Sequence, residues 1–278
     1  MIVDAHHHFW DPATADYPWL SDELAVIRRT FAPEDLQPEL EATGVDATIL
    51  VQTRSSQEET AEFLALASVT PFIRGVIGWV DLTVAAVSEA IASLRAGPGG
   101  DRLVGIRHQA HDEPDTDWLL RDDVVRGIRA VGTAGLAYDL LLRTRELPAA
   151  LELTRRLPDV RFVIDHLAKP PIAAGALEPW AGLITPFAEL EHVACKVSGL
   201  VTEAAWSSWT TDDLQPYMDH AMEVFGSGRL VFGSDWPVCL LAATYQEVVD
   251  ATLTTLSGLD VTEQAAVMGG NATRIYGL

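Results

Sequence analysis

Cysteine is scarce in this chain, since Cys195 and Cys239 are the two present among 278 residues. Their spacing excludes a disulfide framework or a zinc knuckle and predicts two small buried residues in a reducing compartment. The chain also lacks a run of about 18 apolar residues, the length that a membrane-spanning helix needs. The first expected strand is not preceded by a basic segment followed by an apolar one, which is the pattern of a secretory signal peptide. We therefore expect a cytoplasmic protein that does not enter a membrane.

Basic residues are also few, with 19 Lys and Arg against 40 Asp and Glu, for a net charge of −21. Such a surface repels phosphate backbones and anionic lipids, so neither a nucleic acid nor a membrane is an expected partner. A small anion is not excluded, because a pocket can be locally basic. We expect a small-molecule substrate as the partner, and a homo-oligomer stays open.

Eight short runs rich in β-branched residues are each bounded by Gly, Pro or polar residues, which predicts buried strands. They cover residues 2–6, 47–52, 73–80, 103–107, 135–140, 161–166, 193–198 and 229–235. Stretches with a period near 3.6 residues predict helices between and after them. These cover residues 33–42, 58–68, 84–94, 118–131, 146–156, 179–190, 212–225, 245–256 and 262–276.

Eight strand–helix units predict a parallel sheet, and eight is the number that closes a (β/α)₈ TIM barrel. We therefore expect a single α/β domain over residues 1–278. The second candidate is an open doubly wound sheet, which normally carries a glycine-rich turn after its first strand. Here the first strand is followed by His6, His7 and His8. Residues 9–32 form an unusually long connection, for which a lid or site wall and a surface packing arm are both open.

Polar side chains end most of the expected strands, and the active site of such a barrel lies at those ends. The candidates are His6, His8, Gln52, Arg107 or His108, Tyr138 or Asp139, His166, Lys196, Ser198 and Asp235. Strict alternation places Asp4, His6 and His8 on one face of the first strand and His7 on the other. Two imidazoles aimed into one space suit a metal or an oxyanion.

Four of these strand ends carry residues whose chemistry can be argued further. Asp235 is costly to bury without a partner, so we expect it to face a cation, a metal or a water that it activates. His166 is in phase with the apolar face of its strand, and Lys196 shares a face with Ser198. Arg107 and His108 must point in opposite directions, and the sequence leaves open which one faces inward. Arg107 suits a carboxylate or carbonyl group.

These motifs together resemble the amidohydrolase superfamily, in particular the branch with the sugar-acid lactonases and the pyrone dicarboxylate lactonase. The resemblance is carried by residues 4–12 (DAHHHFWDP), 105–109 (GIRHQ), 165–170 (DHLAKP), 196–200 (KVSGL), 232–237 (FGSDWP) and 270–277 (GNATRIYG). It spans essentially the whole chain, and it implies catalytic roles for His6, His8, His166 and Asp235.

The resemblance leaves metal use open. Binuclear members also use a bridging residue on strand 4 and a histidine on strand 5, where this chain has Arg107-His108 and Tyr138-Asp139. The metal would then be one divalent ion, zinc first, held by His6, His8 and Asp235. The branch also contains enzymes that hydrolyse lactones without a metal.

The reaction that the resemblance implies is hydrolysis of a small sugar-derived lactone, a 1,4- or 1,5-aldonolactone. Asp235 would be the general base, while His6, His8 and His166 would stabilise the oxyanion. Substrate groups would be held by Gln52, Arg107, Tyr138 and Lys196. The alternatives are a metal-dependent decarboxylase of the superfamily, a hydrolase of another cyclic ester or amide, and a non-catalytic binder.

Overall fold

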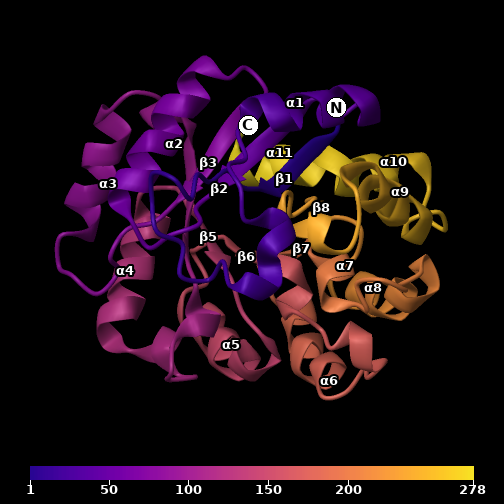
Figure 1. The fold of residues 1–278 in the computed structure, drawn as a ribbon. Coiled ribbons are helices and arrows are strands. Elements are labelled where there is room, and N and C mark those ends of the chain that lie inside the picture. The colour runs from indigo at the N-terminus through magenta and orange to yellow at the C-terminus, as the bar shows by residue number, and fades with distance from the viewer.

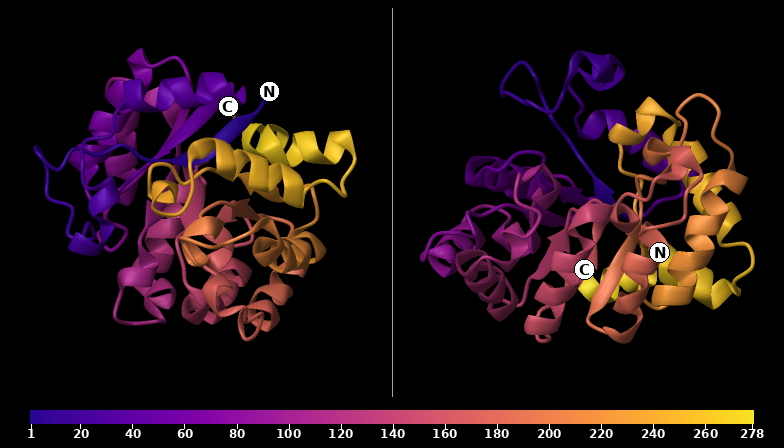
Figure 2. Two further views of the ribbon diagram at one scale, coloured as in Figure 1. Left: turned by 45° about the vertical axis from the view of Figure 1, so that its right-hand side comes forward. Right: turned by 90° about the horizontal axis from the view of Figure 1, so that it is seen from below.

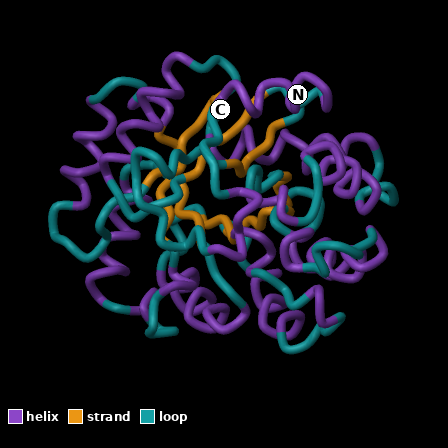
Figure 3. Tube along the Cα trace, in the orientation of Figure 1, coloured by secondary structure: helices purple, strands orange, loops and turns teal.

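The computed structural model describes residues 1–278 and contains one eight-stranded parallel sheet, in which each strand pairs with the next along the chain. The strands are β1 (Val3–His7), β2 (Ala47–Val51), β3 (Ile73–Gly78), β4 (Leu103–His108), β5 (Ala137–Leu140), β6 (Phe162–Ile164), β7 (Val193–Val197) and β8 (Leu230–Phe232). They form a ring inside a layer of helices (Figures 1 and 3). The predicted (β/α)₈ barrel is therefore confirmed.

The helices connect successive strands or follow the last one, and most of them cover the outside of the ring (Figure 1). They are α1 (Pro33–Thr43), α2 (Gln57–Val69), α3 (Val87–Ala96), α4 (Asp122–Thr133), α5 (Leu147–Arg156), α6 (Trp180–Ile184), α7 (Leu200–Glu203), α8 (Thr211–Phe225), α9 (Tyr245–Thr255), α10 (Val261–Ala265) and α11 (Asn271–Tyr276). No helix is both long and apolar enough to cross a membrane.

Two predicted helices are interrupted. The stretch 179–190 divides into α6 and a 3₁₀ turn at Thr185–Glu189, where Pro186 has no N–H to continue the α-helical hydrogen bonds. The stretch 262–276 divides into α10 and α11 around a π-type turn at Ala266–Gly270. A Cβ on Gly269 would lie 2.3 Å from the carbonyl oxygen of Met1, so this glycine lets the turn approach the start of β1.

Much of the barrel interior below the strand ends is apolar, and α11 closes it. Strand residues such as Ala5, Val51 and Val231 pack there with Ile275 and Tyr276 of α11. Figure 2 shows from two further sides that the last helices lie beside the first strand. The opposite end of the barrel, where the strands terminate, is left for polar groups.

The barrel closes between β1 and β8 through a buried carboxylate. Asp4 accepts hydrogen bonds from the backbone N–H of Ser234 at 2.8 Å, from the Ser234 hydroxyl at 2.6 Å and from the Tyr245 hydroxyl at 3.0 Å. Next to it, the Asp235 N–H donates to the His6 carbonyl at 2.8 Å. Asp4 is fully buried. This carboxylate therefore ties the first strand to the segment that carries Asp235.

The expected alternation along β1 is wrong at one point. The register between β1 and β2 shifts between Asp4 and His7, which is the mark of a β-bulge. Asp4 therefore faces the outer layer, whereas His6, two residues later, faces the barrel interior. His7 points outward to the Thr48 hydroxyl at 2.9 Å. Asp4 and His6 do not share a face, although His6 and His8 do.

We expect Asp4→Ala to lower the free energy of unfolding by about 3 kcal/mol, because it leaves several buried donors without an acceptor. The control Tyr245→Phe removes one of these hydrogen bonds, so its expected loss is about 1 kcal/mol. Urea unfolding followed by circular dichroism measures both. Equal losses for the two variants would show that the carboxylate does not tie the strands together.

Candidate active site

A cavity of about 390 Å³ opens at the carboxyl ends of the strands. Four predicted site residues line it, namely His8, Arg107, His166 and Asp235. Other residues on its wall include Gln109, His111, Asp112, Arg143, Lys169, Glu203 and Trp206. Trp19 and Leu24 of the long connection 9–32 also line the cavity. That connection is therefore a wall of the pocket, one of the two roles expected for it.

Three electron-pair donors converge at the floor of this cavity. The Nε2 atoms of His6 and His8 lie 3.2 Å apart. The Oδ1 atom of Asp235 lies 3.7 Å from the first and 3.5 Å from the second. All three side chains are buried. This is the convergence that the His-x-His pair and the strand-8 carboxylate predict.

The hydrogen bonds around the two histidines leave lone pairs facing each other. His8 Nδ1 lies 2.8 Å from the carbonyl oxygen of Val51, which can only accept, so Nε2 of the neutral ring carries no proton. Arg107 Nη1 donates to His6 Nε2 at 3.2 Å. Arg107 already faces the His6 lone pair, but the His8 lone pair and the Asp235 carboxylate lie 3.5 Å apart and repel each other unless a proton or a further cation lies between them.

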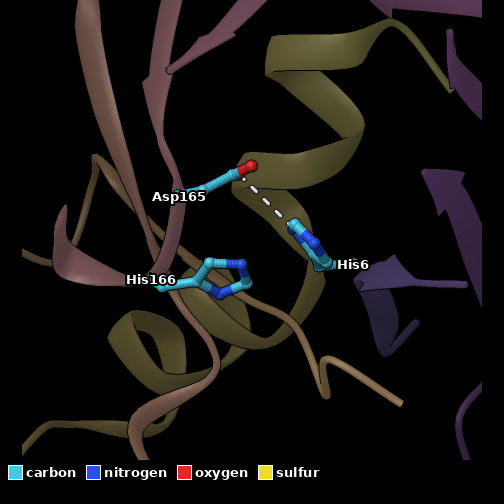
Figure 4. Close-up of side chains that lie close together, drawn as sticks. All are labelled: His6, Asp165 and His166. Atoms are coloured by element: carbon cyan, nitrogen blue, oxygen red, sulfur yellow. Dashed lines mark ion pairs between the residues drawn. The ribbon is translucent and has the colours of Figure 1, made fainter. Parts of the chain in front are cut away.

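The residues present therefore fit one divalent cation. His6, His8 and Asp235 each offer a ligand atom, and two imidazoles with one carboxylate are a donor set that zinc accepts. A second group, His6, Asp165 and His166, also converges (Figure 4). Its carboxylate, however, already faces two cations, Arg107 at 3.0 Å and Lys196 at 3.0 Å. The first group is thus the better candidate metal site.

His166 reaches the cavity through an unusual backbone turn. β6 ends at Ile164, and His166–Lys169 all have positive φ, between 49° and 57°. Four consecutive non-glycine residues in the left-handed region are costly and persist only when their surroundings hold them. The Trp180 indole N–H supports the turn by donating to the Leu167 carbonyl at 2.6 Å. The turn, rather than strand alternation, brings both Asp165 and His166 inward (Figure 4).

His166 is neutral at neutral pH, because burial lowers its pKa to about 4. Its Nδ1 lies 2.8 Å from the Ser198 hydroxyl. If the hydroxyl donates this bond, the ring proton is on Nε2, which lies 3.9 Å from Asp235 Oδ1. A neutral imidazole in this tautomer presents an N–H donor to the cavity.

Asp235 is ionised at neutral pH. Burial opposes its charge, but His166, His8 and His6 together hold the pKa of Asp235 below its usual range. Burial lowers the pKa of His6 well below its ordinary value, so that ring is neutral. Asp235 itself has a left-handed backbone, with φ of 57°, and this turns its carboxylate over the barrel mouth. The carboxylate is thus available to accept a proton.

Arg107 faces the cavity, which settles the alternative that the sequence left open. Its guanidinium donates to the Gln52 side chain at 2.8 Å and to the Gln52 carbonyl at 2.6 Å. His108 points outward and stacks on Trp118 at 4.1 Å. Gln52 does not line the cavity, so the structure places it as the partner of Arg107 rather than beside a substrate.

Two predicted substrate-binding residues lie away from the cavity. Tyr138 is fully buried in the outer layer against Phe162, because it is Asp139 that points into the barrel. The expectation that Tyr138 contacts substrate is therefore corrected. Lys196 faces inward but lies beneath the cavity, where it pairs with Asp139 at 2.5 Å and Asp165 at 3.0 Å.

Sequence reasoning did not single out Asp165 as a site residue. Alternation along the strand assigns it to the face opposite His166, and only the left-handed turn lets both point inward. Its pKa is held well below the usual range, since Lys196, His6 and Arg107 outweigh the opposing effect of burial. The position of Asp165 directly before His166 was the available signal.

The family model described as "Amidohydrolase" matches residues 3–278. The chain belongs to this family. The resemblance drawn from the sequence motifs is confirmed, and family membership makes the chain a hydrolase. The family is often metal-dependent, which agrees with the donor set formed by His6, His8 and Asp235.

Two relatives in the family share about two fifths of their residues with the chain. The L-fucono-1,5-lactonase of Burkholderia multivorans is 39% identical over 289 residues, covering 100% of this chain and 96% of the relative. The L-fucono-1,5-lactonase of Burkholderia ambifaria is 40% identical over 283 residues, with 99% and 94% covered. A crystal structure of a Burkholderia multivorans amidohydrolase with bound zinc has a TM-score of 0.95 at 37% identity, covering 100% and 99% of the two chains.

A substitution at Gly199 tests how sensitive the site is to the position of the His166 side chain. Its φ is +64°, and an added Cβ would lie 2.7 Å from His166 Nδ1. If His166 takes part in hydrolysis, Gly199→Ala should lower the rate of hydrolysis about 100-fold, because displacing a catalytic group by about 1 Å has an effect of that size. Gly175→Ala is the matched control, since φ is +61° there and nothing lies within 4 Å of the added Cβ. A similar rate loss in both variants would mean that backbone strain, not contact with His166, is responsible.

Proposed function

We propose that this chain hydrolyses a sugar-derived lactone, with a 1,5-aldonolactone as the first candidate, to the open-chain hydroxy acid. The observation that carries the proposal is an ionised Asp235 beside His6 and His8, on the floor of a cavity of about 390 Å³. It is supported by the two relatives of 39% and 40% identity that are named L-fucono-1,5-lactonase. Neither is named as a decarboxylase, so that alternative is not favoured.

In this mechanism Asp235 takes a proton from the water that attacks the lactone carbonyl. The His166 Nε2–H donates a hydrogen bond to the carbonyl oxygen that becomes negative, which an N–H fixed in a buried site does at low reorganisation cost. When the ring C–O bond then breaks, the leaving alkoxide takes the proton that Asp235 accepted, which gives the hydroxy acid. Ser198 holds His166 in that tautomer. Arg107 lines the same cavity and adds positive potential where the carboxylate product forms.

We also propose that His6, His8 and Asp235 hold one divalent ion, zinc being the first candidate. When bound, such an ion polarises a carbonyl oxygen or acidifies a coordinated water. The proposal is supported by the converging lone pairs and by the zinc in the related Burkholderia multivorans structure. The Val51 carbonyl fixes the tautomer of His8, as is usual for histidines that bind metals.

We expect Asp235→Asn to lower kcat/KM for 1,5-aldonolactones by at least about 100-fold, since the amide cannot accept the proton. A pH-indicator assay of acid release measures this. Asp112→Asn is the control, because it removes a carboxylate from the same cavity at 64% exposure and outside the histidine group. Its expected loss is under tenfold. Full activity in Asp235→Asn would exclude the carboxylate as the base.

Metal content gives a separate test. We expect the purified protein to carry close to one zinc per chain and His8→Ala to carry much less, because one of three ligands is gone. Elemental analysis by mass spectrometry after dialysis measures this. His111→Ala removes an imidazole that lines the same cavity outside the ligand group, and it should retain the metal. Equal zinc content in both variants would rule out the site at His6, His8 and Asp235.

A further inference from the structure

A row of buried charged and polar groups runs through the barrel from α11 to His6. The Tyr276 hydroxyl donates to the two carboxylate oxygens of Asp139 at 3.0 and 3.1 Å. Asp139 in turn lies 2.5 Å from Lys196 Nζ. Lys196 Nζ then reaches His6 Nδ1 at 3.2 Å and Asp165 at 3.0 Å. The side chains of Asp139, Asp165 and Lys196 have no exposed surface.

This row does not bind substrate. Neither Tyr276, Asp139 nor Lys196 lines the cavity. Burying a lysine and two aspartates is costly, and it is tolerated because Lys196 and Arg107 balance Asp139 and Asp165 in close pairs. Apolar side chains could fill the same volume, as they do on the neighbouring interior positions. Packing alone therefore does not account for the charged side chains of Asp139, Asp165 and Lys196 inside the barrel.

The orientation of the His6 ring supplies that explanation. Its Nε2 faces Asp235 and His8, whereas its Nδ1 faces Asp165 at 3.4 Å and Lys196 at 3.2 Å. The side of the ring away from the cavity is thus held by Lys196, which pairs with Asp139, and by Asp165, which pairs with Lys196. Tyr276 fixes Asp139 by contacting both of its oxygens.

We propose that Tyr276 and Asp139 are positioning residues for the active site, which act on His6 through Lys196. α11 then has two roles: its apolar residues close the barrel, and its tyrosine fixes the charge row beneath the catalytic floor. The inference rests on the proposed lactone hydrolysis only for its kinetic readout. The opposing explanation is a charge cluster that contributes to folding and leaves catalysis unaffected.

The two explanations differ in kinetics. We expect Tyr276→Phe in the full chain to lower kcat for a 1,5-aldonolactone about tenfold, the lower end of what indirect partners of site histidines contribute. KM should stay within about twofold, because the cavity wall is unchanged. Tyr217→Phe is the matched control, since its buried hydroxyl bonds only the carbonyls of Pro171 and Ala176 and its loss should leave kcat unchanged.

A double-mutant cycle tests whether Tyr276 acts on His6 through Asp139. Asp139→Asn should lower kcat by itself, and adding Tyr276→Phe to it should have almost no further effect, because the two residues act through one path. Additive losses would overturn the proposed path. Thermal unfolding of each variant is measured beside the kinetics, and the proposal is also overturned if Tyr276→Phe lowers the melting temperature while kcat stays within twofold of wild type.

Failure of the proposed function can be told apart from failure of the positioning role. If wild type hydrolyses no lactone, the proposed function fails. The positioning role is then tested by the histidine ring signals in the NMR spectrum, where Tyr276→Phe should shift the His6 signals and Tyr217→Phe should not. A rise in KM with unchanged kcat would contradict a positioning role. If neither Tyr276→Phe nor Asp139→Asn folds, the row is a requirement of folding and the positioning role is overturned.

Discussion

The carboxyl end of this barrel brings buried charges together, and each of them depends on an oppositely charged or hydrogen-bonding neighbour. Asp235 stays ionised beside His166, whose Nε2 faces its carboxylate, and Asp165 stays ionised because Lys196 and Arg107 face it. Removal of one partner leaves another charge without compensation, which costs several kcal/mol in a buried site. The positions of the catalytic groups are therefore interdependent, and the site is fixed as one network rather than residue by residue.

The backbone departs from regular strand geometry at the places where this network needs side chains aimed inward. A β-bulge on β1 brings His6 into phase with the interior, and left-handed turns after β6 and β8 direct His166 and Asp235 over the barrel mouth. Each departure is held by a specific contact, such as the Trp180 indole on Leu167 or the Asp4 carboxylate on Ser234. Local strain is thus offset by packing and hydrogen bonds outside the cavity.

The number and order of the strands could be predicted from the sequence, because buried parallel strands are short apolar runs bounded by turn residues. The convergence of His6, His8 and Asp235 could be predicted from the general position of active sites in barrels, and their catalytic roles stay a prediction. Tyr138 and Asp4 were misplaced, because alternation gives two faces but not which face points inward, and because a bulge changes the phase. Asp165 was missed because its orientation depends on a left-handed turn that contains no glycine, so the sequence gives no sign of positive φ there. Lys196 was correctly predicted to point inward, but its depth below the cavity depends on neighbours from three other elements.

The contact between Asp4 and Ser234 joins residues 230 positions apart in the chain. Contacts of such long sequence separation form late, since most of the chain must be ordered before the two ends can meet. During synthesis the first strand and His8 directly after it, which together supply two of the candidate site histidines, are made long before β8 and α11 exist. A nascent chain that lacks these last elements therefore exposes an unpaired strand edge and an incomplete charge cluster, both of which favour aggregation. The charge cluster at the barrel mouth can therefore be complete only after β8 and α11 have packed against β1.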